Sequence, residues 1–420
     1  MTRNLCGLFS LLLACVSPPA PVFDLSTTAL QVDCSSGGDD TVAVQAAINA
    51  GQCLPAGTFR VDAPALGANG RRRDAMLTGA KLCGAGEELT TVLFRGDAHL
   101  LYWVGVNLTA NAEVHHVTLD TTCLTDVVEQ THVTRAWTGA DHAYIHDALF
   151  RHPKRANGVK PGDCVNVVGP GYVAGQPYTP IQGMTIDHVA FESCGRGGVQ
   201  VSRGLDHLKV SNSTFGACGF DVGSEGAGFK DSATGTIVRT LTNVELDHNH
   251  FGSPYTSGYS LEFEWVGGAS VHDNVSDARP WFIYYSDDVA TASNVVTNVT
   301  SAPVVNLADE NHRFSSTNDL LTQAVANFEV VRAAALDTNR QADLGGLSIT
   351  GSQLNQGGAA DFVVLSGVVG AAVTGVTMVY IGPSTRVPAS VVQRTSGGVA
   401  PAVAVPTSAV VETGTIRVGW

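Results

Sequence analysis

The chain has 420 residues, of which 44% are hydrophobic and 15% are charged, and its formal net charge is −14. The longest basic run is Arg71-Arg72-Arg73, so nucleic acid is disfavoured as a partner, and no apolar run after the N-terminus is long enough to span a bilayer. Its 46 glycines, with abundant Val, Thr and Asn, suit short strands and tight turns, and they favour one elongated solenoid over several globular domains.

Residues 1–15, MTRNLCGLFSLLLAC, predict a bacterial export signal, because Arg3 precedes a short apolar stretch that ends at a small residue. The stretch Leu12-Leu13-Ala14-Cys15 also resembles a lipobox, in which Cys15 would carry the lipid that anchors the mature protein to a membrane. Ordinary cleavage and free secretion are the alternative. Both interpretations predict a secreted or cell-envelope protein, with a linker over residues 16–35.

Seven cysteines remain after Cys6 and Cys15. An exported protein can form disulfides, and we expect Cys34 to pair with Cys53. The other five show no CxxC or His-containing zinc spacing, so we interpret them as small buried apolar residues.

Residues 36–95 are predicted to form an N-terminal cap and the first coils. Asp39-Asp40-Thr41 supplies helix-capping side chains, and Gly51 ends the helix. Its mostly apolar face consists of Val42, Val44, Ala46, Ala47 and Ile48. We expect this helix to cover the open end of the solenoid.

The stretch GDDTVAVQAAINA, followed by LPAGTFRV, is similar to the N-terminal signature of the pectate-lyase-like β-helix superfamily. Residues 77–94, LTGAKLCGAGEELTTVLF, resemble the first coils of the same proteins. The superfamily includes polysaccharide lyases, glycoside hydrolases, epimerases and phage tailspikes, so the resemblance implies a right-handed parallel β-helix that acts on a polysaccharide. No subfamily is assigned: KPGDCVNV resembles a polygalacturonase strand, yet it holds one aspartate where that strand has two, and the partner motifs are missing.

Residues 96–314 repeat one short pattern and are predicted to form the central β-helix. The copies are IDHVAF (186–191), VSNSTF (210–215) and LDHNHF (246–251), with looser copies IHDALF (145–150) and VHDNVS (271–276). The third position is always Asp, His or Asn, the side chains most enriched at positive φ: Asp147, His188, Asn212, His248 and Asp273. Each copy therefore predicts a sharp corner followed by an inward Phe, and Cys194 and Cys218 should stack inside neighbouring coils.

A second strand follows each corner, and its period of two predicts which side chains leave the core. If these strands stack, one external polar strip forms from Asn166, Gln200, Lys230, Glu262, Glu264 and either Tyr284 or Tyr285. Long insertions in the same coils suggest a binding surface. Asp163 could face either way, because a turn precedes it.

The strip supports two chemistries. Residues two apart on a strand lie about 6.5 to 7 Å apart, so Glu262 and Glu264 could hydrolyse a glycosidic bond with inversion. A lyase would instead use Lys230 as the base and Arg196, Arg203 or a bound Ca²⁺ to neutralise a uronate carboxylate. A neighbouring Glu262 would raise the pKa of Lys230 and oppose that role, which leaves an outward Tyr as the substitute base.

Two further interpretations stay open. Exposed Lys and Glu on neighbouring strands commonly form plain cross-strand pairs, so the chain could be a non-catalytic carbohydrate-binding or adhesive surface protein. The sequence demands no cofactor, although Ca²⁺ could serve, and most of the thirteen histidines are interpreted as bend or surface residues. Residues 315–420 predict further coils or a C-terminal cap.

Overall fold

The computed structural model describes residues 33–63, 75–97, 104–125, 132–151, 162–173, 178–224, 228–230, 237–252, 258–308, 311–324, 328–334, 344–358, 360–366, 368–369, 371–381 and 391–394. The predicted export signal, Cys15 and nearly all of the linker lie outside these residues. Within them, no helix combines the length and apolar character needed to cross a membrane.

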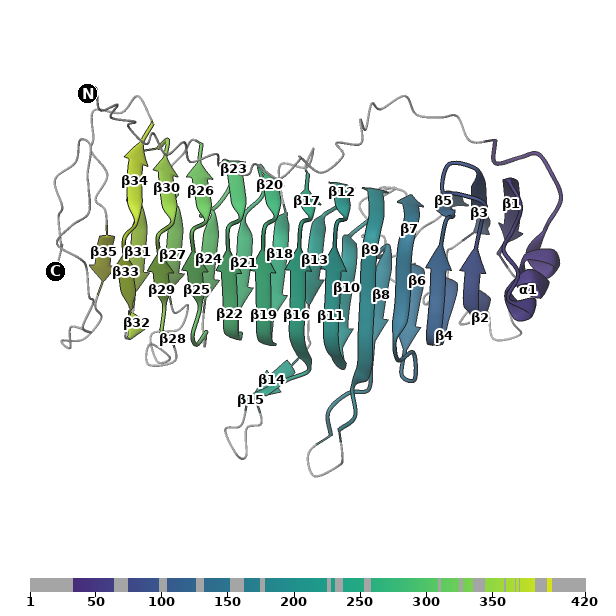
Figure 1. Ribbon diagram of the computed structural model, residues 1–420, viewed down its shortest axis with the longest axis horizontal. Coiled ribbons are helices and arrows are strands. Elements are labelled where there is room, and N and C mark those ends of the chain that lie inside the picture. Colours follow the sequence, from purple (N-terminus) through teal and green to yellow (C-terminus); the bar gives the residue numbers. More distant parts are fainter. Residues whose placement is uncertain are drawn as a thin grey trace, which may run out of the picture.

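The chain winds into a right-handed parallel β-helix, as predicted, and its coils follow one another along the long axis of the molecule (Figure 1). A complete coil contributes one strand to each of three parallel sheets, which we call sheet 1, sheet 2 and sheet 3 in the order in which the chain visits them. Strands of one sheet pair with the strands one coil before and one coil after. Side chains that share a position in successive coils therefore lie one above another.

Sheet 1 consists of the first parts of β2 (Ala75–Cys83) and β4 (Val104–His115), followed by β6 (His132–Trp137), β8 (Val165–Val168), β10 (Gly197–Arg203), β13 (Phe220–Ser224), β18 (Tyr259–Glu264), β21 (Trp281–Tyr284), β24 (Val305–Ala308), β27 (Val331–Ala334), β31 (Val363–Ser366) and β35 (Val391–Arg394). Sheet 2 consists of the second parts of β2 and β4, the first parts of β7 (Ala143–Arg151) and β9 (Ile181–Ser193), and then β11 (Leu205–Ser211), β16 (Leu241–Asp247), β19 (Val266–His272), β22 (Asp287–Ala292), β25 (Ser315–Thr317), β29 (Ser348–Thr350) and β33 (Ala372–Thr374).

Sheet 3 consists of β1 (Gly57–Asp62), β3 (Thr90–Asp97), β5 (Thr118–Thr125), the second parts of β7 and β9, and then β12 (Thr214–Ala217), β17 (His250–Phe251), β20 (Val275–Asp277), β23 (Val295–Val299), β26 (Leu320–Gln323), β30 (Gln353–Gln356) and β34 (Thr377–Tyr380). Two short pairs stand apart from the sheets, β14 (Gly228–Lys230) with β15 (Ile237–Arg239), and β28 (Leu344–Gly345) with β32 (Val368–Val369). The coils thus continue past residue 315 as far as β35.

The helix α1 (Thr41–Ala50) covers the first coils at one end of the solenoid (Figure 1). Asp39 accepts a hydrogen bond from the Thr41 amide, and Gly51 ends the helix with a left-handed φ of 65°. Val44 and Ile48 are buried, and a Cβ on Gly79 of β2 would lie 2.2 Å from the Ile48 side chain. The lack of a side chain at Gly79 lets the helix approach the first coil, although Val42 is 83% exposed and stays outside the apolar contact.

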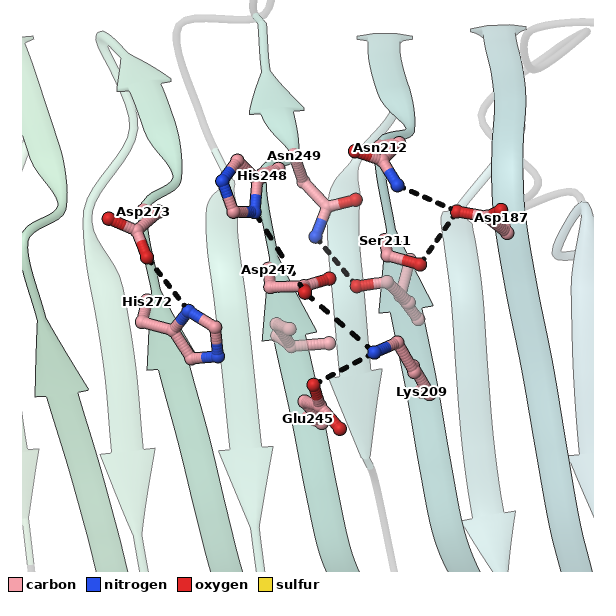
Figure 2. Close-up of polar contacts among 12 residues, drawn as sticks. Asp187, Lys209, Ser211, Asn212, Glu245, Asp247, His248, Asn249, His272 and Asp273 are labelled. Carbon is pink, nitrogen blue, oxygen red and sulfur yellow. Dashed lines mark hydrogen bonds and ion pairs between the residues drawn. The ribbon is translucent and has the colours of Figure 1, made fainter. Parts of the chain in front are cut away.

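The predicted corners between sheets 2 and 3 are confirmed. Their bend residues have positive φ of 46° to 56°: Asp147, His188, Asn212, His248 and Asp273. Figure 2 shows three of them on consecutive corners. A second set of bends lies five residues earlier in each coil and includes His207 at 64° and Asn243 at 56°. These bends fall inside the sheet 2 strands β11 and β16, and the corner bends follow the ends of the same strands.

The inward phenylalanines after the corners form one stack in the core. Ring centroids are 5.4 Å apart for Phe150 and Phe191, 4.6 Å for Phe191 and Phe215, and 5.3 Å for Phe215 and Phe251. Each ring is at most 1% exposed. In the next coil Ser276 takes the same position against Phe251, which is why that copy of the sequence pattern lacks its Phe.

A ladder of buried polar side chains runs beside the corners and was not predicted. Asn249 Oδ1 accepts the backbone N–H of Ser213, Asn274 Oδ1 that of Asn249, Asn294 Oδ1 that of Asn274, and Asp319 Oδ1 that of Asn294, over 2.8 to 3.0 Å. The Nδ2 groups of the three asparagines donate to backbone carbonyls. The ladder satisfies amides that the corners withdraw from the sheets, which is required where water has no access.

Replacing Asn274 with Ala removes the acceptor of the Asn249 amide and the donor to two carbonyls. We expect the free energy of unfolding to fall by about 2 to 4 kcal/mol, since buried polar groups lose their partners. Denaturant unfolding measures it. Asn306→Ala, which removes an amide from the outer face of β24, should change the stability by less than about 0.5 kcal/mol. Equal effects of the two substitutions would contradict a stabilising ladder.

The predicted disulfide between Cys34 and Cys53 is wrong. Cys34 bonds to Cys123, Cys53 to Cys83, and Cys194 to Cys218, while Cys164 is free and buried. Of the five cysteines interpreted as apolar filler, only Cys164 has that role. Cys194 and Cys218 do lie in neighbouring coils as predicted, and a covalent bond joins them.

Candidate functional site

The outer face of sheet 1 carries a column of residues that pair in register from coil to coil. Asn166 pairs with Gln200, Gln200 with Gly223, and Gly223 with Glu262. Arg135 precedes this series and Phe282 follows it. The predicted alignment of Asn166, Gln200 and Glu262 is therefore confirmed.

Lys230 does not belong to this column, and its predicted place beside Glu262 is wrong. The sheet 1 strand of that coil is β13, so Gly223 takes the position between Gln200 and Glu262. Lys230 ends β14, which pairs antiparallel with β15 in a separate hairpin between sheets 1 and 2. A period of two occurs in both strands, and it cannot tell which of them joins the parallel sheet.

An interior ion pair fixes β13 in sheet 1. Asp221 points inward, and Arg279 Nη1 donates to its Oδ1 over 2.9 Å. Arg279 also donates to the carbonyl of Cys218 and is only 1% exposed. Removing one partner of such a buried pair is strongly unfavourable, so this contact stabilises the Phe220–Ser224 strand in the stack.

The side chain of Asp163 points to the outer side of sheet 1 and belongs to a buried polar cluster at the upstream end of the column. Arg196 donates to both of its carboxylate oxygens, over 3.0 and 2.9 Å, and Asn166 donates over 3.1 Å. His132 Nδ1 lies 3.3 Å from Oδ2 and accepts the Asp163 backbone N–H. Burial alone would raise the pKa of Asp163, but the charge of Arg196 and the contacts with His132 outweigh it and lower the pKa to about 2.

This cluster contains buried acceptors that the described residues leave unsatisfied. Asn166 Oδ1 and Gln200 Oε1 have no hydrogen-bond partner there. The Phe220 ring lies across the column, since a Cβ on Gly197 or Gly223 would come within 2.9 Å of it. Upstream, the Arg135 guanidinium lies 3.5 Å from the centroid of the Trp137 ring. Amide, guanidinium and aromatic groups thus meet on one face.

Downstream, two carboxylates and several half-buried rings share the face. Glu262 and Glu264 both point outward from β18. Tyr259 stacks on Phe282 with centroids 5.1 Å apart, and Phe282 lies 4.8 Å from Tyr284, which pairs in register with Glu264. Burial, and then the charge of Glu262, raises the pKa of Tyr259. Tyr259 is therefore a poor candidate for a base.

An aromatic pair borders these carboxylates at the edge toward sheet 2. Trp265 and Tyr285 both have positive φ, 61° and 51°, and their rings stack 4.3 Å apart. Gly228 of β14 would place a Cβ 2.5 Å from Trp265, so the base of the hairpin lies against this pair. Tyr285 thus belongs to the edge of the sheet 1 face, and Tyr284 is the tyrosine that the strip contains.

The remaining predicted binding residues are placed as follows. Arg196 is engaged by Asp163, which opposes its use as the neutraliser of a substrate carboxylate. Arg203 lies at the end of β10 and donates from Nε to the carbonyl of Gly169 over 3.3 Å. A Ca²⁺ requirement stays a prediction, and on this face Asp163 already has both oxygens occupied by Arg196.

Sheet 2 presents a different kind of polar face, shown in Figure 2. Lys209 Nζ lies 2.9 Å from Glu245 and 3.7 Å from Asp247, and Asp187 accepts from Ser211 and Asn212. These charges pair across neighbouring strands. They fit the plain cross-strand interpretation.

Three residues of the sheet 1 face were missed from the sequence: Phe220, Tyr259 and Phe282. Phe220 and Tyr259 lie outside the strand segments to which the alternation was applied, and the alternation left the direction of residues 281–288 open. At the start of β13 the alternation fails, because Asp221 is held inward by Arg279. The available signal was the pair of glycines, Gly197 and Gly223, that make room for the Phe220 ring.

Comparison of the chain with family models and with curated proteins finds no match. Among solved structures it is similar to the A-module of the Azotobacter vinelandii mannuronan C-5 epimerase AlgE6, with 15% identity, 88% of this chain and 96% of that chain covered, and a TM-score of 0.47. It is also similar to the Agl-KA catalytic domain (11% identity, 86% and 66% covered, TM-score 0.45) and to the Streptococcus pneumoniae surface protein and adhesin PfbA (12%, 86% and 97%, 0.42).

Asp163→Asn should make the unfolding free energy less sensitive to acid. A carboxylate with a lowered pKa stabilises the fold above its unfolded pKa of about 3.9, and this contribution is lost as the pH falls toward the folded value of about 2. We expect the variant to be about 2 to 3 kcal/mol less stable at pH 7, with the difference shrinking between about pH 4 and pH 2. Denaturant unfolding across this range measures it, and a constant difference would show that Asp163 is not held as an anion.

Proposed function

We propose that the outer face of sheet 1 binds a polysaccharide and that Glu262 and Glu264 hydrolyse its glycosidic bonds. The observation that carries the proposal is the position of both carboxylates on the outer side of one strand, among half-buried aromatic rings. Sugar rings have apolar C–H faces that pack on aromatic rings, while their hydroxyls need polar partners. The face offers both kinds of group in one row.

The spacing of the two carboxylates suits inversion. Residues two apart on a strand lie about 6.5 to 7 Å apart, within the range of about 6.5 to 9.5 Å used when one carboxyl protonates the leaving oxygen and the other activates water. The lyase alternative loses Lys230 as its base, because Lys230 is outside the column, and it then depends on Tyr284. Asp163 positions the upstream cluster rather than reacting: its pKa of about 2 leaves it without a proton to donate and makes it a weak base, and Arg196 donates to both of its oxygens.

Glu262→Gln and Glu264→Gln should each lower the rate of reducing-end release by about 10² to 10⁴-fold, because a carboxamide neither donates nor accepts the required proton. The assay is incubation of the purified protein with neutral and acidic polysaccharides, with reducing ends and unsaturated uronate followed in parallel. Glu245→Gln is the matched control, as Glu245 lies on the outer face of sheet 2, and it should retain full activity.

The parallel readouts separate the alternatives. Formation of unsaturated uronate would contradict hydrolysis and support lyase chemistry. Binding of a glycan without either product would identify a non-catalytic carbohydrate-binding or adhesive protein, which is the second candidate. The ion pairing of Asp163 with Arg196 favours that candidate, because it uses charges that a catalytic cluster would direct at the substrate.

We also propose that the chain is exported, with Cys15 as a lipid attachment site. Three disulfides support the export part, since such bonds persist in oxidising compartments. Expression of the complete chain in a bacterial host should place it in the envelope fraction, and Cys15→Ala should release it from the membrane. A wild-type product that stays in the cytoplasm would contradict export, and an unchanged membrane association of the variant would contradict the lipid anchor.

A further inference from the structure

Three metal-ligating side chains converge on the outer face of sheet 2, in the coils nearest α1. Glu113 and His115 lie on β4, and His146 lies on β7. His115 and His146 pair in register, and their rings stack with centroids 4.8 Å apart and planes within 3°. The bend role that explains His116 and His142, both at positive φ, does not explain these two strand residues.

The imidazole nitrogens of both histidines face one carboxylate. Glu113 Oε1 is 3.3 Å from His146 Nε2, and Glu113 Oε2 is 3.9 Å from His115 Nε2. One ligand atom from each residue lies within 4.8 Å of the other two. A zinc ion binds nitrogen and carboxylate oxygen at about 2.0 to 2.2 Å, so small side-chain rotations would bring all three atoms into one coordination sphere.

The groups behind the histidines direct the Nε2 atoms toward this centre. Asp147 Oδ2 lies 2.8 Å from His146 Nδ1 and needs a proton there, which leaves the lone pair of a neutral His146 on Nε2. A carboxylate behind a ligating histidine is a recurring arrangement in metal sites. His115 Nδ1 lies 2.7 Å from His116 Nδ1, so a proton on His115 Nδ1 can be shared within that pair.

The Nε2 atom of His115 is buried and has no hydrogen-bond partner in the part of the chain that the structure describes. His146 Nε2 lies within hydrogen-bond distance of Glu113 Oε1, and His115 Nε2 faces the other oxygen of the same carboxylate. A cation that displaces the Nε2 proton of His146 would be ligated by both nitrogens and the carboxylate.

We propose that Glu113, His115 and His146 bind one Zn²⁺ ion on the outer face of sheet 2, separate from the candidate site on sheet 1. Two imidazoles and one carboxylate select a borderline transition metal over Ca²⁺ or Mg²⁺, which prefer oxygen ligands. Three protein ligands leave a fourth position for water or an external ligand. The proposal does not depend on the glycan chemistry of Glu262 and Glu264.

A second cluster on the same sheet serves as an internal comparison. Glu245, Asp247 and His272 also bring their ligand atoms within 4.8 Å of one another. There Lys209 Nζ lies 2.9 Å from Glu245 and already supplies the cation (Figure 2). At the proposed site the nearest ammonium among the described residues, on Lys81, is 3.7 Å from Glu113, which is beyond hydrogen-bond distance. Glu113 is therefore less engaged by its lysine than Glu245 is by Lys209.

The test uses the full chain, freed of metal with a chelator and titrated with Zn²⁺ in a calorimeter. We expect one Zn²⁺ per chain and a raised unfolding temperature, because the ion binds the native state. His115→Ala and His146→Ala should each weaken binding at least about 100-fold, and Asp147→Asn about 10 to 100-fold. Lys81→Met should tighten binding, since it removes a competing positive charge.

His272→Ala tests the comparison cluster, and His207→Asn tests a solvent-exposed His–Asp pair while keeping a residue that tolerates positive φ. Neither should change the affinity. Glu113→Gln keeps the size of the side chain, so weak Zn²⁺ binding with an unchanged metal-free unfolding midpoint would separate lost ligation from lost folding. No binding by the wild type, binding that persists in the His115→Ala, His146→Ala double variant, or an equal loss in His272→Ala would overturn the proposal.

Discussion

The structure depends on satisfying backbone amides at the corners between sheets 2 and 3. A parallel coil must change direction without water to solvate the groups it withdraws from the sheets. The left-handed residue makes the turn, and the next side chain enters the core to accept the N–H of the preceding coil. Asn249, Asn274 and Asn294 do this in succession. Each of these hydrogen bonds forms only when the two coils are in register, so the corner fixes the alignment of whole coils.

That alignment has opposite consequences on the two outer faces. On sheet 2 it places Lys209 beside Glu245 and Asp247, and the charges neutralise one another. On sheet 1 it places Gly223 between Gln200 and Glu262, and the Phe220 ring occupies the space that a side chain at Gly223 would take. The face thus changes along the axis from a buried ionic cluster around Asp163 to a row of rings and carboxylates. A long polymer lying along the axis would meet both regions.

The sequence predicts the fold well because its strongest signals are local. Asp, His or Asn before an inward Phe describes a corner that a single coil can make by itself, and Gly51 ends α1 for an equally local reason. The ladder residues directly follow the bend residues in the sequence, yet an Asn there looks the same whether it faces water or the core. Only the neighbouring coil, whose amide it accepts, decides its direction.

The misplaced residues share a different cause. Cys34 bonds to Cys123 across 89 positions, which depends on how the N-terminal segment lies against later coils. Lys230 has a strand-like neighbourhood, but Asp221 and Arg279 select an earlier segment for sheet 1. In both cases a distant partner outweighs local periodicity.

The histidines show how far local reasoning reaches. Positive φ accounts for His116, His142, His188, His207 and His248, so a search for metal ligands by composition alone would be misled by them. His115 and His146 occupy outward strand positions with no bend to make, as His272 also does. A strand histidine stacked on another, with Glu113 in front and Asp147 behind, has its nitrogens oriented by neighbours on two sides. The bend role covers five histidines, and the proposed ligation rests on this arrangement around His115 and His146.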